Sequence, residues 1–396
     1  MPQRHNVSKL LHTATSTDPF LKQLNITERQ ETQLLSVRKK VRSALKQGFK
    51  ELRDRANEFY DSDQLYLSRL APKFWTQGSY VYRTLNRPEH LPPQQIDIDD
   101  GVYFPMELVE GNPKAANRLL FNSVENILKK LADSNNWAVD TNKSTCVRII
   151  VDAEMHVDIP IYAIPEERYA VLKATVESRQ FDGLLSAEAT DDNDIWLDPS
   201  QVYLAVRDKD KWKPSDPMVL QRWFEGRCKV HSNRLRRICR YLKGWRDLTW
   251  IKGGPSSITL MVAAAETFDN HLNTQRTPFQ SDCEALLAVA RELPDQFAKN
   301  ICNPEEPEEV MFPRNLKDEE IVEIRDKVRL FKGNVEISLC HSQTSHEVVA
   351  QLQAIFGQRI PSRPDLVELM PVAAAVRKIP AQKQDKPKPS KTNRSA

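Results

Sequence analysis

The sequence predicts an α+β protein in which a half of mixed strand and helix content, built around a β-sheet, is followed by a helical half. Apolar and polar residues alternate between residues 145 and 163 and within QQIDIDDGVYF at 94–104, which is the period of a β-strand. From residue 216 onward, apolar residues recur at three- and four-residue steps, which is the period of a helix. We expect a ligand to bind in the cleft between two such halves.

The length and composition suit a two-domain globular protein. The chain has 396 residues, and we expect a sheet domain with a long N-terminal helix at 1–210, a helical lobe at 211–360 and a disordered basic tail at 377–396. The net charge is +3, which argues against a protein that coats nucleic acid, so no stable nucleic-acid partner is expected. No bilayer-spanning segment, secretory signal or CxxC pair is visible, which predicts a cytoplasmic protein with free thiols and no membrane partner.

Two helices are expected in the first half. The first covers residues 27–60, where Thr27 and Gln30 form a capping box. Its apolar residues lie on one stripe: Leu34, Val37, Val41, Leu45, Leu52 and Phe59. A second helix is predicted at 115–134.

A β-hairpin is predicted where the sequence reads TCVRIIV–DAE–MHVDIPIY, between residues 145 and 163. His156 and Asp158 lie on one face of its second strand, and the apolar residues lie on the other. We expect His156 to be a hydrogen-bonded, half-buried histidine rather than a ligand. One further short strand is expected at VYLAVR, 202–207.

The second half should consist of successive helices. Pro217 lies in the first turn of one helix, with Ser215 or Asp216 as its cap, and the helical pattern continues to Trp250. The sequence SITLMVAAAETF begins another helix, and Ser281 with Glu284 caps the next. Two more are expected at 317–331 and 344–357.

Three aspartates carry the predicted chemistry. Asp97 and Asp99 are two apart on a strand, so their side chains leave the same face, and Asp158 can join them from another strand of the sheet. Unpaired carboxylates on a buried strand are costly, and a DxD sequence alone is most often a surface strand or an Asx turn. Together, however, three carboxylates suit Mg²⁺, and two ions about 4 Å apart would stabilise an in-line phosphoryl transfer. Asp100 should point away and hydrogen-bond a loop.

Two features upstream and downstream of the acids favour a phosphate ligand. Gly78 lets a phosphate approach the backbone, and Ser79 at the start of a helix would add a hydroxyl and free N–H donors. Lys243 shares a helix face with Arg236 and Arg240, at i, i+4 and i+7. This stripe suits a polyphosphate, and a solvated helix face is the equal alternative.

These residues resemble the nucleotidyltransferase signature of the DNA polymerase β superfamily: a Gly-Ser pair, an Asp-hydrophobic-Asp strand and a third Asp on a later strand. Longer segments are similar to the bacterial CD-NTase (cGAS/DncV-like) family, in its DncV-type cyclic GMP–AMP synthase branch. They are QGSYVYRTLNRPEHLPPQQIDIDDGVYFPM, HVDIPIYAIP, KWKPSDPMVLQRWF, YLKGWRDLTW and GGPSSITLM. The resemblance implies a nucleotidyltransferase sheet domain with a helical C-terminal lobe and the active site between them.

The same resemblance implies roles for individual residues. Asp97, Asp99 and Asp158 would be catalytic and would hold two Mg²⁺ ions, with Mn²⁺ as the alternative metal. The nucleotide-binding residues would be Gln77, Gly78 and Ser79 at the phosphates, Arg148 near the nucleotide, Ser215 at a base, and Lys243 and Ser257 at the triphosphate.

The implied activity is synthesis of 3′,3′-cyclic GMP–AMP, or a related cyclic dinucleotide, from ATP and GTP. Family members act in antiphage defence (CBASS) by feeding a nucleotide-activated effector, and a ubiquitin-ligation-like enzyme often conjugates the cyclase through its C-terminal residue, here Ala396. Two alternatives remain. One is a template-independent nucleotidyltransferase acting on RNA or protein, and the other is a catalytically inactive nucleotide sensor, against which the presence of all three aspartates argues.

Overall fold

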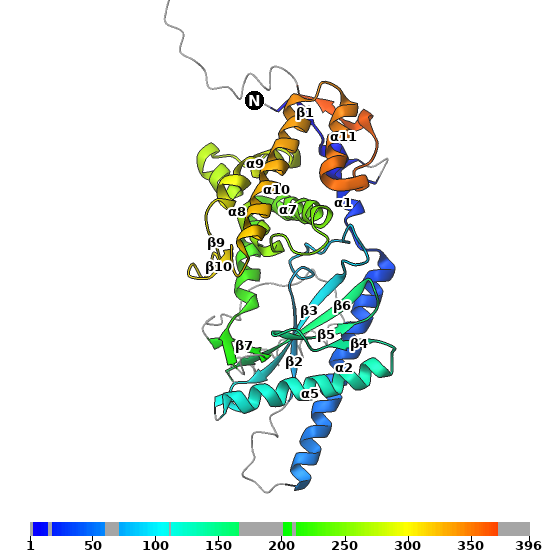
Figure 1. The fold of residues 1–396 in the computed structure, drawn as a ribbon, viewed down its shortest axis with the longest axis vertical. Helices are drawn as coiled ribbons and strands as arrows, with labels where there is room; N and C mark the ends of the chain where they lie inside the picture. Colours follow the sequence, from blue (N-terminus) through cyan, green and yellow to red (C-terminus); the bar gives the residue numbers. More distant parts are fainter. Residues whose placement is uncertain are drawn as a thin grey trace, which may run out of the picture.

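The computed structural model describes residues 3–14, 18–59, 71–110, 112–165, 201–207 and 211–370. These residues form a sheet-containing lobe and a helical lobe, stacked along the longest axis of the molecule (Figure 1). No helix in this described part combines the length and apolar content that a membrane crossing needs.

In the described residues, seven strands form the main sheet, and the predicted hairpin is confirmed as two of its strands. The order is β2-β3-β6-β5-β4, with β7 beside the end of β6 and β8 beside β7. Strands β3 and β6 run parallel, and the other neighbours run antiparallel. The strands are β2 (Lys73–Gln77), β3 (Ile96–Pro105), β4 (Ala138–Asp140), β5 (Cys146–Ile150), β6 (Met155–Ile164), β7 (Tyr203–Val206) and β8 (Lys211–Pro214).

The two helices predicted in the first half are present as α2 (Glu28–Phe59) and α5 (Pro113–Asp133). Both cover one face of the sheet (Figure 1). The Thr27–Gln30 capping box is present, with the Thr27 backbone N–H donating to the Gln30 side chain at 3.0 Å. The apolar stripe of α2 packs on the sheet from Leu34 to Phe49, but Leu52 is exposed, since α2 continues past the sheet. A short helix, α4 (Glu107–Glu110), follows β3.

The helical lobe lies beyond the sheet lobe along the long axis (Figure 1), and its predicted helices are confirmed. They are α7 (Pro217–Thr249), α8 (Ser257–Gln275), α9 (Asp282–Phe297), α10 (Asp318–Glu336) and α11 (Ser345–Phe356), with the hairpin β9 (Ile301–Cys302) and β10 (Val310–Phe312). Asp216 caps α7 and Ser281 caps α9. The prediction of one continuous helix to Trp250 missed a kink at Ser232, where φ is 62° and ψ is −178°.

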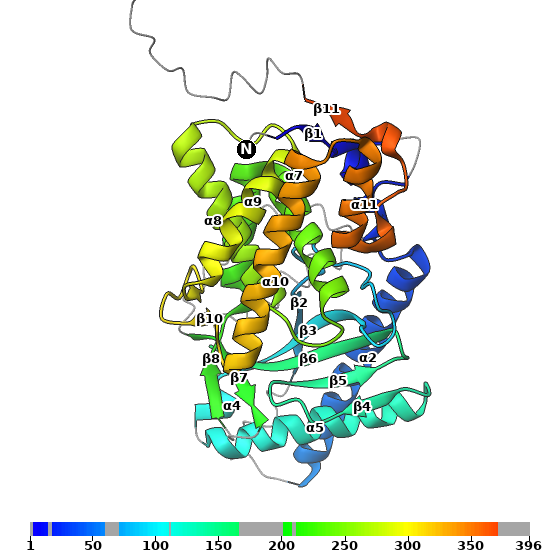
Figure 2. The same ribbon diagram turned by 45° about the horizontal axis from the view of Figure 1, so that its top comes forward.

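The apolar residues of the N-terminal segment pack in the helical lobe. Strand β1 (His5–Asn6) pairs with β11 (Glu368–Leu369), and Figure 2 shows them side by side. Residues Val7, Leu10 and Phe20 pack in the helical core, and Leu366 and Val367 pack against it. The segment also holds a π-helical turn at Lys9–Thr13 and α1 (Phe20–Gln23), and the C-terminal part holds short turns at Ile337–His341, Gly357–Arg359 and Pro364–Leu366. The basic tail predicted at 377–396 lies outside the described residues.

Candidate active site

Four of the predicted site residues form one row across the sheet. Gln77 of β2 pairs with Asp99 of β3, Asp99 with Asp158 of β6, and Asp158 with Arg148 of β5. Residues paired in register point to the same face of a sheet. This is the face opposite α2 and α5, so the sheet itself brings these side chains together beneath the helical lobe.

Asp97 lies one pleat away from this row, on the same face of β3. Burial raises the pKa of Asp99 well above the ordinary carboxyl value, and the neighbouring charges of Asp97 and Asp158 raise it further. Arg148 and Lys243 oppose this shift in the pKa without cancelling it. The carboxylates therefore repel one another in a setting that favours binding of an added cation.

Residues 78–83 form a turn directly above Asp99, where the sequence predicted the start of a helix. The φ of Gly78 is +72°, and a Cβ at this position would overlap Oδ2 of Asp99. Only glycine fits this close approach. The hydroxyl of Ser79 is buried and finds no hydrogen-bond partner among the described residues, so it is available to a phosphate oxygen.

The cations of the α7 stripe are not a solvated helix face, because all three hydrogen-bond residues between 82 and 86. Arg236 donates to the Tyr82 carbonyl at 2.9 Å, Arg240 to Oδ1 of Asn86 at 2.8 Å, and Lys243 to the Thr84 carbonyl at 2.7 Å. All three side chains hold the chain just after the Gly78–Ser79 turn. We call these contacts the α7 clamp.

Lys243 is also the member of the clamp that lies near the acids. It is buried, and burial lowers the pKa of its ammonium, while Asp97 and then Asp247 oppose that shift in the pKa. The desolvated ammonium therefore lies close enough to Asp97 to interact with it and with a ligand bound there.

Ser215 and Ser257 lie at the starts of helices. Ser215 is half-buried just before α7, and its backbone N–H donates to the Val202 carbonyl at 2.9 Å. Ser257 is the first residue of α8, and its hydroxyl accepts from Nη1 of Arg246 at 3.3 Å. Arg246 was not among the predicted site residues, although its spacing of three residues from Lys243 places both on one helix face.

Asp100 points away from the other acids, as predicted, but its partner is a helix rather than a loop. Nε of Arg42, on α2, donates to Oδ2 of Asp100 at 2.7 Å, and Thr76 of β2 donates to Oδ1 at 2.9 Å. Asp100 is 1% exposed, so this pair ties α2 to the back of the site. His156 is buried, with Nδ1 3.0 Å from the side chain of Gln95, consistent with a structural histidine.

The side chain of Gln77 is held inside the fold. Its Nε2 donates to the Tyr162 hydroxyl at 3.2 Å, and Tyr162 stacks on Tyr103 with ring centroids 4.8 Å apart. Gln77 therefore forms the wall of the site next to Asp99.

The donor set partly fits the divalent ion that the family implies. Asp97 and Asp99 offer carboxylates whose mutual repulsion a cation would relieve, and carboxylate oxygens are the ligands that Mg²⁺ prefers. Asp158 instead forms two hydrogen bonds with Arg148, at 2.6 and 2.7 Å. Within the described residues, no three acidic, histidine or cysteine side chains converge closely enough to hold an ion in the present arrangement.

A carboxylate strand, a glycine-serine turn over it and a helical lobe facing it define a nucleotidyltransferase. Comparison with protein families agrees: residues 72–162 match the cyclic GMP-AMP synthase DncV-like nucleotidyltransferase domain, and residues 232–368 match the cyclic GMP-AMP synthase C-terminal domain. The chain belongs to the DncV-like cyclic GMP-AMP synthase family.

Characterised relatives extend this likeness over most of the chain. A cyclic GMP-AMP synthase of Vibrio cholerae is 34% identical over 81% of this chain and 74% of its own length. A cyclic GMP-AMP synthase of Escherichia coli is 32% identical over 82% of this chain and 76% of its own length. The crystal structure of V. cholerae DncV with the linear intermediate 5′ pppA(3′,5′)pG superposes with a TM-score of 0.78, at 27% identity over 93% of this chain and all of that one. Its complex with nonhydrolyzable GTP gives 0.76 at 27% identity, with the same coverage.

Proposed function

We propose that this protein is a cyclic dinucleotide synthase that makes 3′,3′-cyclic GMP–AMP from ATP and GTP. The observation that carries the proposal is the placement of Asp97, Asp99 and Asp158 on one sheet face beneath the Gly78–Ser79 turn. The names of the relatives support the choice of product. In each of two steps, the 3′-hydroxyl of one nucleotide attacks the α-phosphorus of a triphosphate, and pyrophosphate leaves with the electron pair of the broken bond.

We assign the work of positioning and charge control to this chain's own residues. Asp97 and Asp99, joined by Asp158, would hold the divalent ions, two Mg²⁺ or Mn²⁺, which supply charge neutralisation when bound. The Ser79 hydroxyl and the Lys243 ammonium bind phosphate oxygens, and Ser257 and Arg148 bind the nucleotide from the α8 and β5 sides. Ser215 contacts a base. Asp158 accepts the proton of the attacking hydroxyl.

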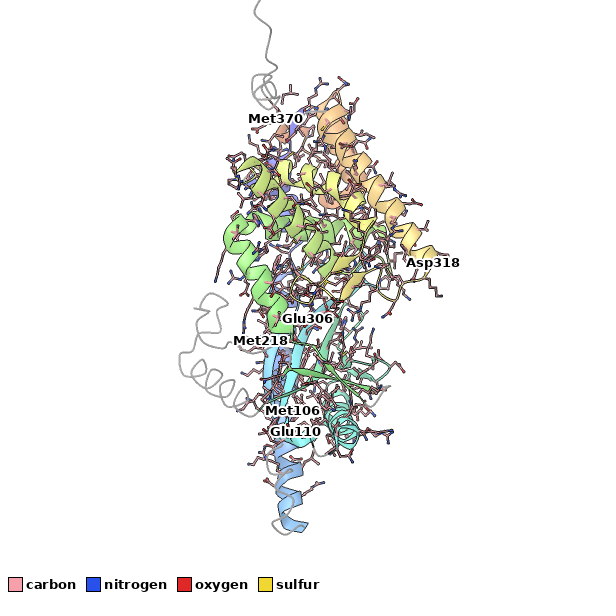
Figure 3. All side chains as sticks on the ribbon, turned by 90° about the vertical axis from the view of Figure 1, so that its left-hand side faces the viewer. Met106, Glu110, Met218, Glu306, Asp318 and Met370 are labelled. Atoms are coloured by element: carbon pink, nitrogen blue, oxygen red, sulfur yellow. The ribbon has the colours of Figure 1, made fainter. Side chains whose placement is uncertain are left out.

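The protein would act in the cytoplasm in antiphage defence, where its product activates an effector. A ubiquitin-ligation-like enzyme would conjugate Ala396. In support, Met370, where the described chain ends, lies at the end of the helical lobe far from the sheet (Figure 3).

Deleting residues 380–396 should leave synthesis unchanged and prevent conjugation by a cognate ligase. Loss of synthesis would show that the tail belongs to the enzyme.

Incubation with labelled ATP and GTP plus Mg²⁺, followed by phosphatase digestion and mass measurement, tests the activity. A phosphatase-resistant dinucleotide of the mass of cyclic GMP–AMP is expected from the wild-type protein and not from Asp97→Asn. A ladder of long products would instead indicate RNA extension, and absence of any product would indicate a nucleotide sensor. Nuclease digestion of the product then defines its linkages.

A further inference from the structure

Arg148 holds the carboxylate of Asp158 by both oxygens. Nε donates to Oδ1 at 2.6 Å, and Nη2 donates to Oδ2 at 2.7 Å. The two residues are register partners on β5 and β6, and their side chains are only 19% and 15% exposed. A planar guanidinium that donates to both oxygens fixes the plane of a carboxylate as well as its position.

This pairing makes Asp158 a poor cation ligand. A carboxylate offers about four lone-pair sites, and the two that face Arg148 are occupied. His156 adds a further obstacle, because its Nε2 lies 3.9 Å from Oδ1. Asp158 is the register partner of Asp99, yet the acids in the described residues do not converge on one point.

We propose that Arg148 is a positioning residue that keeps Asp158 out of the cation site until a nucleoside triphosphate enters the cleft. Phosphate oxygens accept the same forked pair of hydrogen bonds from a guanidinium, so a triphosphate competes with Asp158 for Arg148. Once released, Asp158 is free to turn toward its neighbour Asp99. The inference rests on the proposed function, because it assumes that the three aspartates act as cation ligands and that the substrate carries a triphosphate.

The order of binding follows from this arrangement. Without nucleotide, the site presents two free carboxylates, and a divalent ion binds weakly. With nucleotide, the third carboxylate joins them, so the complete cation site forms only when there is a phosphate to transfer.

Mn²⁺ binding to the nucleotide-free, full-length protein tests the proposal without any turnover. Free Mn²⁺ can be measured by electron paramagnetic resonance during titration of the wild type and of Arg148→Lys. Lysine keeps the positive charge but cannot donate to both oxygens of Asp158 at once, so Arg148→Lys should bind Mn²⁺ roughly tenfold more tightly than the wild type. This factor is the low end of the change in affinity that loss of one charge-assisted hydrogen bond produces. Circular dichroism and thermal unfolding check that the variant is folded.

Two controls separate release of Asp158 from a general change in charge. In an Asp158→Asn background, Arg148→Lys should have no effect on Mn²⁺ affinity. Arg207→Lys, which alters a different arginine–carboxylate pair with Glu125, should also leave Mn²⁺ affinity at the wild-type value. Equal Mn²⁺ affinity of the wild type and Arg148→Lys, or a gain that persists with Asn at position 158, would overturn the proposal.

Nucleotide should abolish the difference. With a nonhydrolysable ATP analogue bound, the wild type and Arg148→Lys should have the same Mn²⁺ affinity, and a persistent gap would refute release by the triphosphate. The two proposals fail separately. If the wild type makes cyclic GMP–AMP but binds Mn²⁺ as tightly as Arg148→Lys does, the proposed role of Arg148 is wrong. If the Mn²⁺ effect holds and another product forms, the proposed activity is wrong.

Discussion

Substituting alanine for Gly78 tests whether the turn sets the position of Asp99. The backbone at this residue has a φ of +72°. An L-residue in the left-handed region costs about 1–2 kcal/mol, so the free energy of unfolding should fall by about that amount. The new methyl group would in addition overlap Oδ2 of Asp99, and because the obstacle is a carboxylate on a strand, either the turn or the acid must shift.

A displacement of the turn or of Asp99 should lower the rate of dinucleotide formation more than it lowers the stability. Misplacing a reacting group by about 1 Å lowers the rate on the order of 100-fold, or about 2.7 kcal/mol of activation free energy. Gly78→Ala should therefore lose far more activity than its stability change explains. Initial rates of dinucleotide formation with saturating ATP, GTP and Mg²⁺, together with urea unfolding, measure the two effects separately.

Gly253→Ala is the matched control. Gly253 has a φ of +81°, but a Cβ there meets nothing within 4 Å. This variant should carry the same backbone cost and keep its turnover. If the two variants lost stability and rate equally, the contact between the turn and Asp99 would not matter for catalysis, and the assignment of the turn to the active site would be refuted.

The remaining predictions concern charges. Because the pKa of Asp99 is raised in the folded state, ionised Asp99 destabilises the metal-free protein above that folded pKa. Asp99→Asn should therefore raise the melting temperature at pH 7 in EDTA, and this gain should shrink as the pH falls toward the ordinary carboxyl pKa. An equal gain in melting temperature at all pH values would contradict this. Arg42→Met leaves the buried carboxylate of Asp100 without its cationic partner and should cost about 3–5 kcal/mol in urea unfolding. The double variant Arg42→Met/Asp100→Asn should lose less stability. A smaller loss in the single variant than in the double variant would rule out the pair as a stabilising contact. Lys243→Ala should raise the nucleotide concentration needed for half-maximal activity and lower the rate of dinucleotide formation. Lys243→Arg should recover only part of that activity, because a guanidinium does not replace a buried ammonium at the Thr84 carbonyl. Normal nucleotide binding by Lys243→Ala would exclude a role of Lys243 in binding the triphosphate.

The positions of the strands and of the paired aspartates could be predicted from the sequence. Period-two alternation and a polar residue on a buried strand are local signals that need no distant contact. The Arg148–Asp158 pair was also within reach: the short turn between Ile150 and His156, which pair across it, sets Arg148 opposite Asp158. The ion pair was nevertheless not predicted, because it requires the exact register of the hairpin and not only its existence.

Other features depend on distant contacts that no local pattern contains. Two of the three acceptors in the α7 clamp are backbone carbonyls, which every residue has, so the sequence does not mark these two contacts. The kink at Ser232 occurs without a proline or a glycine at that position. The N-terminal strand at His5–Asn6 pairs with residues more than 360 positions away, and an apolar segment alone does not reveal that partner.

The α7 clamp has a mechanical consequence. The Gly78–Ser79 turn continues directly from β2, and the residues just after it are fastened to α7, so at this point the two lobes share one piece of backbone. The kink at Ser232 precedes Arg236, Arg240 and Lys243, so a bend at the kink would move the second half of α7 and the Gly78–Ser79 turn together. Because of this coupling, we expect the position of the Gly78–Ser79 turn above Asp99 to depend on the conformation of α7.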